Sequence, residues 1–269
     1  MQKSFDMSVF FRRAISSVVL TTLFVSAVVM LPVWAFNAVI MIFLILGLGE
    51  FLKIYDKSIS CFNMLNYLIL GLGVILLHLC GLGFLGLTLA IIGAFVSVML
   101  RKIQIEHATS HVALLILGFV CIPFFGSFMM DLRNQTHGIL YVLFFIFVIK
   151  LSDIGAYIIG TRWGSIKIMP LISPKKSLQG CLGGLVFSLI AGIVLNNFFK
   201  IFSFGQVVGI SIVMNVLGQF GDMCESLIKR SFGVKDSGGF IPGIGGIFDL
   251  LDSLLWAVPV MVWLTSVCK

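Results

Sequence analysis

The densest group of charged residues in this chain lies between Gly221 and Asp252. The stretch holds five of the eleven acidic residues and three basic ones, although apolar runs flank it on both sides. These eight residues are Asp222, Glu225, Asp236, Asp249 and Asp252, with Lys229, Arg230 and Lys235. Ionisable groups near a bilayer are costly and usually mark a functional path or site.

The spacing of the acids suits two neighbouring helices. Asp222, Glu225 and Lys229 occupy positions i, i+3 and i+7, which share one helix face. Asp249 and Asp252 are again three residues apart. Mg²⁺ prefers carboxylate oxygens, keeps some waters and shares phosphate oxygens with a substrate. We therefore favour a site for a divalent metal and a polyphosphate.

A set of salt bridges is the simpler alternative. Asp222 and Glu225 would pair with Lys229 and Arg230, while the two later aspartates would be acids at a helix N-terminus. This alternative explains each pair, but it does not explain why so many of the acids gather in one stretch.

A second polar region runs from Lys150 to Gly184. Asp153 follows an apolar run, where it could act in a site or simply pair with Lys150, three residues earlier. The sequence Ser173-Pro174-Lys175-Lys176 then presents two ammonium groups on a turn, which suits phosphate. Ordinary loop charge is an equally good explanation of these lysines. The P-loop pattern GxxxxGK[ST] does not occur in the region.

The composition identifies the elements that must position these residues. Of the 269 residues, 59% are hydrophobic and 11% charged, and the mean hydropathy is +1.15. A soluble domain carries about 25% charged residues, so we predict an all-α polytopic membrane protein. The net charge is +7, but the basic residues sit in short loops rather than in one patch, so no nucleic-acid partner is expected.

About nine apolar runs have the length that a membrane-spanning helix needs. They lie near residues 14–34, 35–52, 62–80, 82–100, 111–130, 138–160, 180–199, 204–226 and 245–267. With the N-terminus in the cytoplasm, fourteen of the eighteen Lys and Arg residues fall in inside segments and three in outside segments. This topology puts both polar regions at the cytoplasmic face of the cell (inner) membrane.

The chain divides by function rather than by composition. Residues 1–137 are expected to be transmembrane scaffold that could also form a homodimer, and residues 138–269 are expected to be the catalytic region. Two glycine pairs, Gly180/Gly184 and Gly205/Gly209, have the spacing that lets helices approach closely. None of the six cysteines forms a CxxC pair, so neither a zinc site nor a disulfide framework is expected.

Several motifs resemble the bacterial phosphatidate cytidylyltransferase, or CDP-diacylglycerol synthase, family. They are Ser152-Asp153-x-x-Ala156-Tyr157, Ile172-Ser173-Pro174-Lys175-Lys176-Ser177, Gly221-Asp222-x-x-Glu225-Ser226-x-x-Lys229-Arg230, and Lys235-Asp236-Ser237-Gly238-x-x-Ile241-Pro242-Gly243-x-Gly245-Gly246-x-x-Asp249-x-x-Asp252-Ser253. Many members have His and Arg where this chain has Ile244 and Leu250, so neither the His nor the Arg can be required here. Ser177, Gln179 and Thr161 also depart from the common pattern.

The resemblance implies that CTP and phosphatidate react to CDP-diacylglycerol and pyrophosphate with Mg²⁺, to which a second cation could be added. It implies catalytic roles for Asp222, Asp249, Lys229 and Asp153. Metal ligands would come from Asp222 and Asp249, supported by Glu225 and Asp252. Substrate contacts would come from Ser173, Lys175, Lys176, Arg230, Lys235, Asp236 and Ser237.

Two other classes fit less well. A transporter would also carry charges and broken helices in the membrane, but its site would lie near the midplane and its halves would repeat. The sequence shows no internal repeat, and its polar residues concentrate toward the C-terminus. Other membrane phosphotransferases are disfavoured because the sequence contains neither DGxxAR nor an adjacent Asp-Asp pair.

Overall fold

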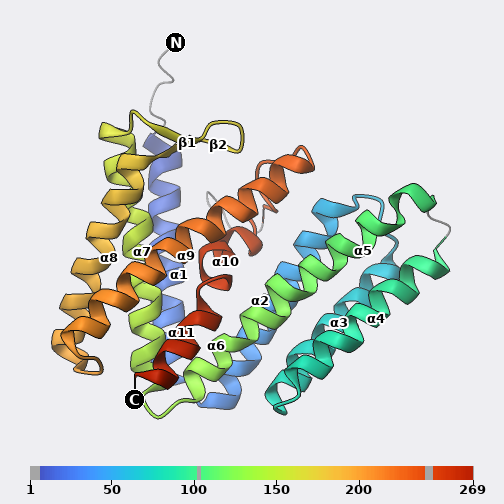
Figure 1. The fold of residues 1–269 in the computed structure, drawn as a ribbon, viewed down its shortest axis with the longest axis horizontal. Coiled ribbons are helices and arrows are strands. Elements are labelled where there is room, and N and C mark those ends of the chain that lie inside the picture. The colour runs from blue at the N-terminus through green and yellow to red at the C-terminus, as the bar shows by residue number, and fades with distance from the viewer. Residues whose placement is uncertain (1–6, 102–103, 240–244, 269) are drawn as a thin grey trace.

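The computed structural model describes residues 7–101, 104–239 and 245–268, with side chains from residue 19 onward. Helices account for nearly all of the described chain (Figure 1). The first half contains α1 (Met7–Met30), α2 (Val33–Tyr55), α3 (Cys61–Leu79), α4 (Gly83–Leu100), α5 (Ile105–Phe119), the π-helical turn η1 (Val120–Phe124) and α6 (Phe125–Asn134). The second half contains α7 (Gly138–Trp163), β1 (Lys167–Met169), β2 (Ser173–Ser177), α8 (Leu178–Phe199), α9 (Phe204–Ser231), α10 (Phe248–Leu255) and α11 (Val258–Val267).

The prediction of an all-α polytopic membrane protein is confirmed. Eight segments of the described chain are long and apolar enough to cross a membrane, and α1 adds the apolar stretch Val19–Met30. One of the eight, Ile105–Asn134, joins α5 to α6 through η1, where Pro123 cannot donate a backbone hydrogen bond. The first two helices separate at Pro32, slightly earlier than predicted, because a proline is readily accepted just before a helix begins.

The ends of the helices place the two polar regions together. Helix α1 begins at the end of the molecule that carries the β1–β2 hairpin, and α9 finishes toward that end as well (Figure 1). The chain ends at the opposite end of the molecule (Figure 1). This arrangement is compatible with the predicted topology, although which end faces the cytoplasm stays a prediction.

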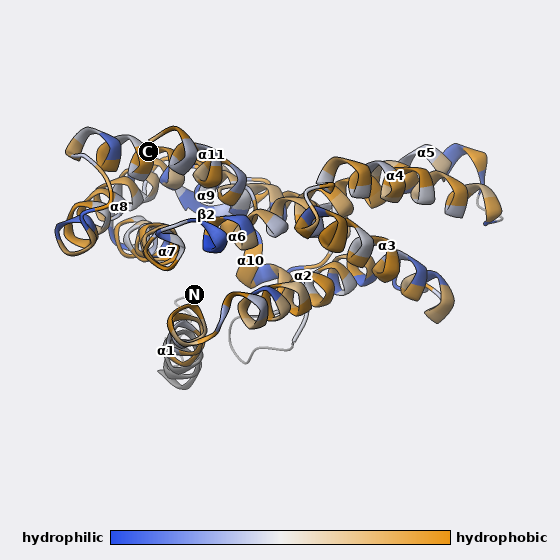
Figure 2. Cartoon of the chain, turned by 90° about the horizontal axis from the view of Figure 1, so that it is seen from below, coloured by the Kyte–Doolittle hydropathy of each residue, from blue (hydrophilic) through white to orange (hydrophobic). Residues whose placement is uncertain are grey.

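Hydrophobic and hydrophilic segments of the described chain lie in different parts of the molecule. Helices α3 and α4 are mostly hydrophobic, whereas hydrophilic segments gather around β2 and α9 (Figure 2). Large apolar side chains such as Phe84 and Leu100 are exposed on α4, as expected for lipid contact. By contrast, Phe144, Phe145 and Ile149 of α7 are fully buried, so α7 forms part of the packed centre.

An ion pair fixes the end of α2 that lies nearest the polar region. Asp56, which ends α2, accepts hydrogen bonds from Ser58 Oγ at 2.8 Å and from Arg101 Nη2 at 3.2 Å. Burial alone would raise the pKa of Asp56, but the hydrogen bonds from Ser58 and Arg101 outweigh burial and lower this pKa. The contact ties the end of α2 to the segment that follows α4.

Small residues let α7, α8 and α9 approach closely, but only one of the two predicted glycine pairs does so. A Cβ added to Gly180 would lie 3.0 Å from the carbonyl oxygen of Ala156, and one added to Gly184 would lie 2.9 Å from Gln219 Nε2. The packing role of this pair is confirmed. A Cβ at Gly205 or Gly209 would meet nothing within 4 Å, so the prediction for that pair is wrong. The spacing is the same in both pairs, but no segment of the described chain packs against the second.

We expect Gly184→Leu to destabilise the fold and Gly209→Leu to be tolerated. A leucine at position 184 must displace Gln219 and Ser152, and overpacking of this kind costs about 1–3 kcal/mol. The measurement is the midpoint of thermal unfolding of each purified variant in detergent. Equal midpoints for the two variants would contradict the packing role of Gly184.

Candidate functional site

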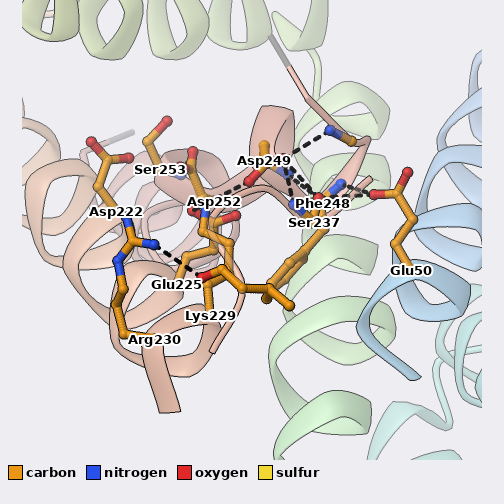
Figure 3. Close-up of polar contacts among 12 residues, drawn as sticks. Glu50, Asp222, Glu225, Lys229, Arg230, Ser237, Phe248, Asp249, Asp252 and Ser253 are labelled. Atoms are coloured by element: carbon orange, nitrogen blue, oxygen red, sulfur yellow. Dashed lines mark hydrogen bonds and ion pairs between the residues drawn. The ribbon is translucent and has the colours of Figure 1, made fainter. Parts of the chain in front are cut away.

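A lysine held between two acids joins α9 to α10. Lys229 Nζ lies 2.8 Å from Glu225 Oε2 on its own helix and 2.5 Å from Asp249 Oδ1 on α10 (Figure 3). Lys229 is only 9% exposed and Glu225 only 4% exposed. Charges removed from water need close partners, because an unpaired buried charge is very costly. The predicted face of Glu225 and Lys229 is therefore confirmed, and it is directed at Asp249.

The second oxygen of Asp249 organises the chain before α10. Asp249 Oδ2 accepts hydrogen bonds from Ser237 N at 2.9 Å, Ser237 Oγ at 2.8 Å and Gly246 N at 2.8 Å. Both carboxylate oxygens of Asp249 are thus bonded within the protein. A negative charge in the first turn of a helix is also stabilised by the helix dipole.

Glu50 is a member of this network that the sequence interpretation missed. It lies on α2, and its Oε2 accepts hydrogen bonds from Phe248 N at 2.9 Å and from Ser237 Oγ at 3.1 Å (Figure 3). It is the only acidic residue in the apolar sequence of α2. An ionisable residue within an apolar span is costly, so this isolation was the available signal.

A second group of charges lies where α7, α9, α10 and the hairpin meet. Lys150 Nζ donates to Ser253 Oγ at 3.1 Å and to Asp153 Oδ2 at 3.5 Å. Lys176 Nζ lies 3.4 Å from Asp222 Oδ2. Asp252 lies on α10 next to Ser253, the residue that accepts from Lys150. We call these five residues, Lys150, Asp153, Lys176, Asp222 and Asp252, the mixed-charge cluster.

Close packing of α9 on α10 brings two acids of this cluster to neighbouring helices. A Cβ at Gly221 would collide with the carbonyl oxygen of Asp252, so the backbones touch at this point. Figure 3 shows the side chains of Asp222, Asp252 and Asp249 along the contact between these helices. The cluster has three carboxylates and two ammonium groups, which leaves one negative charge that a bound cation could neutralise.

The fit of Mg²⁺ depends on what a substrate would add. In the described parts of the chain, no three acid, histidine or cysteine side chains gather closely enough to hold a metal on their own. Mg²⁺ at phosphate sites is commonly held by one or two carboxylates together with phosphate oxygens and waters. Asp222 on α9 and Asp252 on α10, whose helices touch at Gly221, could supply such carboxylates, and Asp249 lies one helical turn from Asp252. One carboxylate oxygen of Glu225 and one of Asp249 already contact the ammonium group of Lys229.

The hairpin replaces what the sequence suggested was a loop. Strands β1 and β2 pair antiparallel, with Lys167 opposite Ser177 and Met169 opposite Ser173. The side chain of Ser177 accepts a hydrogen bond from Gly180 N and so caps the start of α8. Lys175 is exposed while Lys176 turns toward α9, so the two neighbouring lysines lie in different surroundings.

The remaining predicted residues lie around the edge of the site. Arg230 Nη1 donates to the carbonyl oxygen of Val234 at 3.0 Å and is exposed, whereas the salt-bridge alternative paired it with an acid. Lys235 and Asp236 are exposed, and Ser237 is buried. The part of the motif between Ile241 and Ile244 lies outside the described residues.

An apolar cavity of about 250 Å³ adjoins both charged groups. It lies among α1, α2, α6, α7 and α10, and Lys150 and Asp249 are the charged residues of its wall. The rest of the wall is nearly all apolar, including Phe24, Leu44 and Leu254. The cavity therefore offers a place where apolar chains and a polar group could be bound side by side.

The arrangement defines a class of protein: a polytopic helical membrane protein in which several lysines and carboxylates meet beside an apolar cavity. The chain belongs to the cytidylyltransferase family, whose sequence model matches residues 11–268. It is similar to phosphatidate cytidylyltransferases of Staphylococcus haemolyticus and Staphylococcus saprophyticus, each 42% identical over 137 residues, and of Staphylococcus aureus, 38% identical over 136 residues. Each match covers 50% of this chain and 52% of the relative, so the matched segment spans about half the length of these relatives. The transporter alternative finds no support in these likenesses.

Removing the positive charge of Lys229 should destabilise the protein strongly. Lys229→Met leaves Glu225 and Asp249 buried without their partner, and breaking a buried ion pair typically costs about 3–5 kcal/mol. The matched control is Lys235→Met, because Lys235 is exposed. Unfolding of both variants in mixed micelles gives the comparison, and a Lys229→Met variant as stable as the control would contradict the pairing.

Proposed function

We propose that this protein transfers the cytidylyl group of CTP to phosphatidate, forming CDP-diacylglycerol and pyrophosphate for phospholipid synthesis. The observation that carries the proposal is the contact between the apolar cavity and the charged groups at Lys150 and Asp249. A lipid with an anionic head group needs both environments at once. The names of the relatives and the motifs from Ser152 to Ser253 favour phosphatidate among such lipids.

The reaction requires positioning and charge stabilisation more than proton transfer. An oxygen of the phosphatidate phosphate attacks the α-phosphorus of CTP, a new P–O bond forms, and the bond to the β-phosphate oxygen breaks as pyrophosphate leaves. The attacking oxygen is already anionic, so no base needs to remove a proton. Holding the two phosphates in line and neutralising their charge are the main catalytic tasks.

The lysines of the site suit these tasks. In this proposal, Lys150 contacts the lipid phosphate at the cavity, and Lys176 contacts the nucleotide phosphates from the hairpin. Ser173, Lys175, Arg230, Lys235 and Asp236 surround the polar end and would orient the nucleotide. Lys229 and Ser237 hold Asp249 in place through their hydrogen bonds. Asp153 keeps Lys150 directed at the site.

Mg²⁺ is the cofactor that we propose for this site. Bound there, Mg²⁺ would neutralise charge on the transferring phosphates. Asp222 and Asp249 remain the proposed ligands, with Asp252 and Glu225 in support, and a second cation would find the same excess of negative charge. The cell membrane as location and a homodimer formed by the helices of residues 1–137 are further proposals.

Loss of either proposed metal ligand should abolish most of the activity. Asp222→Asn and Asp249→Asn keep the side-chain size but remove the charge, and loss of one electrostatic group at a transition state costs about 100-fold or more in kcat. The assay follows labelled CTP into CDP-diacylglycerol with and without a divalent cation. Glu106→Gln is the matched control, because Glu106 is an exposed acid at the start of α5.

Three results would count against this function. Wild-type protein that forms no CDP-diacylglycerol from CTP and phosphatidate would refute the reaction. Wild-type activity that persists in a chelator would refute the metal. Activity of Asp222→Asn and Asp249→Asn close to that of Glu106→Gln would refute the assignment of these ligands.

Filling the cavity should weaken binding of the lipid without weakening binding of the nucleotide. Thr21 lines the cavity from α1, whereas Leu23 on the same helix is 62% exposed. We expect Thr21→Trp to raise the KM for phosphatidate about tenfold, which is about 1.4 kcal/mol of binding, and to leave the KM for CTP unchanged. Leu23→Trp is the control. Equal KM values for phosphatidate in the two variants would place the acyl chains elsewhere.

A further inference from the structure

Glu50 reaches the site from the half of the chain that the sequence assigned to scaffold. Its carboxylate on α2 contacts residues 187 and 198 positions later in the chain, Ser237 and Phe248. Figure 3 shows the Glu50 side chain extending from α2 toward this segment. Ser237 donates hydrogen bonds to Asp249, and Phe248 precedes Asp249 in the chain. Glu50 therefore acts on the site through these two residues.

The contact of Glu50 with Phe248 supplies a cap that α10 lacks. Helix α10 begins at Phe248, and the residue before it, Ile247, makes no side-chain cap hydrogen bond. The first backbone N–H groups of a helix need an acceptor from outside the helix. Glu50 Oε2 accepts from Phe248 N at 2.9 Å and meets this need from α2. A carboxylate at this end is also favoured by the helix dipole.

The contact of Glu50 with Ser237 places the Ser237 hydroxyl between two acids. Its hydroxyl oxygen lies 3.1 Å from Glu50 Oε2 and 2.8 Å from Asp249 Oδ2, and it accepts a hydrogen bond from Asp249 N at 3.3 Å. One hydroxyl proton serves two carboxylate oxygens here. The position of Ser237, and with it the hydrogen bonds to Asp249, therefore depends on Glu50.

Two glycines leave the space that Glu50 occupies. A Cβ added to Gly238 would lie 2.7 Å from Glu50 Oε1, and a Cβ added to Gly246 would collide with Glu50 Oε2 and Ser237 Oγ. A Cβ added to the neighbouring Gly239 would meet no atom of the described residues within 4 Å. A side chain at position 238 would collide with the Glu50 carboxylate, which explains why glycine occupies this position.

We propose that Glu50 is a positioning residue, which fixes the start of α10 and Ser237 so that Asp249 keeps the orientation required for cytidylyl transfer. The proposal rests on the proposed function for its effect on rate. It makes the helix α2 of the N-terminal half part of the active site.

Three variants and one control variant test the proposal by activity. Glu50→Ala removes the oxygen that accepts from both Ser237 Oγ and Phe248 N, and we expect kcat to fall about 10- to 100-fold, the effect of losing a hydrogen bond to a charged group. Glu50→Gln keeps an oxygen in the place of Oε2 that can accept from Phe248 N and Ser237 Oγ, and it should restore kcat to within about fivefold of wild type, since the hydrogen bonds survive without the charge. Gly238→Ala should lower kcat because its methyl group displaces the Glu50 carboxylate, whereas Gly239→Ala should not.

A double-mutant cycle separates this role from a general loss of structure. If Gly238→Ala acts through Glu50, adding it to Glu50→Ala should lower kcat by less than about twofold further. The same loss in both backgrounds would overturn the proposal. So would a Glu50→Ala variant with kcat within about threefold of wild type. Should Glu50→Ala fail to fold, equal activity of Gly238→Ala and Gly239→Ala would overturn it.

Hydrogen exchange provides a readout that does not depend on the reaction. We expect the backbone amides of residues 245–255 to exchange at least about tenfold faster in Glu50→Ala, because Phe248 N loses its acceptor. Glu106→Gln is the control and should leave this exchange unchanged. Unchanged exchange in Glu50→Ala would overturn the role of Glu50, whereas a wild-type protein without cytidylyl transfer would overturn the proposed function instead.

Discussion

The site depends on lysines that neutralise buried and half-buried carboxylates between helices. Lys229 lies between Glu225 and Asp249, Lys150 pairs with Asp153, and Lys176 pairs with Asp222. Within a membrane protein, water cannot solvate such acids freely, so each acid needs a nearby positive charge or hydrogen-bond donor. These pairs decide where the hairpin and α10 rest against α7 and α9, because moving either segment would separate charges.

Hydrogen bonds to two acids hold Ser237 and Gly246 near the start of α10. A glycine-rich segment has little side-chain packing of its own, so its conformation must be imposed by contacts from outside. Asp249 binds Ser237 and Gly246, and Glu50 binds Ser237 and the first amide of α10. Residues from both halves of the chain therefore meet at the start of α10.

The sequence predicted the helices well because their signal is local. A run of about 20 apolar residues is enough to identify a span, and the i, i+3, i+7 spacing of Asp222, Glu225 and Lys229 placed them correctly on one side of α9. The sequence could not assign partners. Whether Lys229 binds Asp222 or Asp249 depends on how α10 packs on α9, which the backbone contact at Gly221 decides. Gly205 and Gly209 show the same limit, since spacing alone does not reveal whether a neighbour is present.

Glu50 and the hairpin were missed for related physical reasons. An isolated acid in an apolar span signals a partner, but the partners of Glu50 lie almost two hundred residues away in the sequence. The strands Lys167–Met169 and Ser173–Ser177 are too short and too polar to show alternating hydrophobicity. The isolation of Glu50 therefore indicates that a partner exists but not which residues supply it, and the hairpin leaves no clear periodicity.

Lys229 holds the site together through its charge on Asp249, and a double-mutant cycle measures the strength of this pairing. The free energy of unfolding is determined in mixed micelles for wild type, Lys229→Met, Asp249→Asn and the double variant. Direct pairing predicts that the two losses are not additive, with an interaction energy of about 1–3 kcal/mol. Losses that add to within about 0.5 kcal/mol would contradict the account.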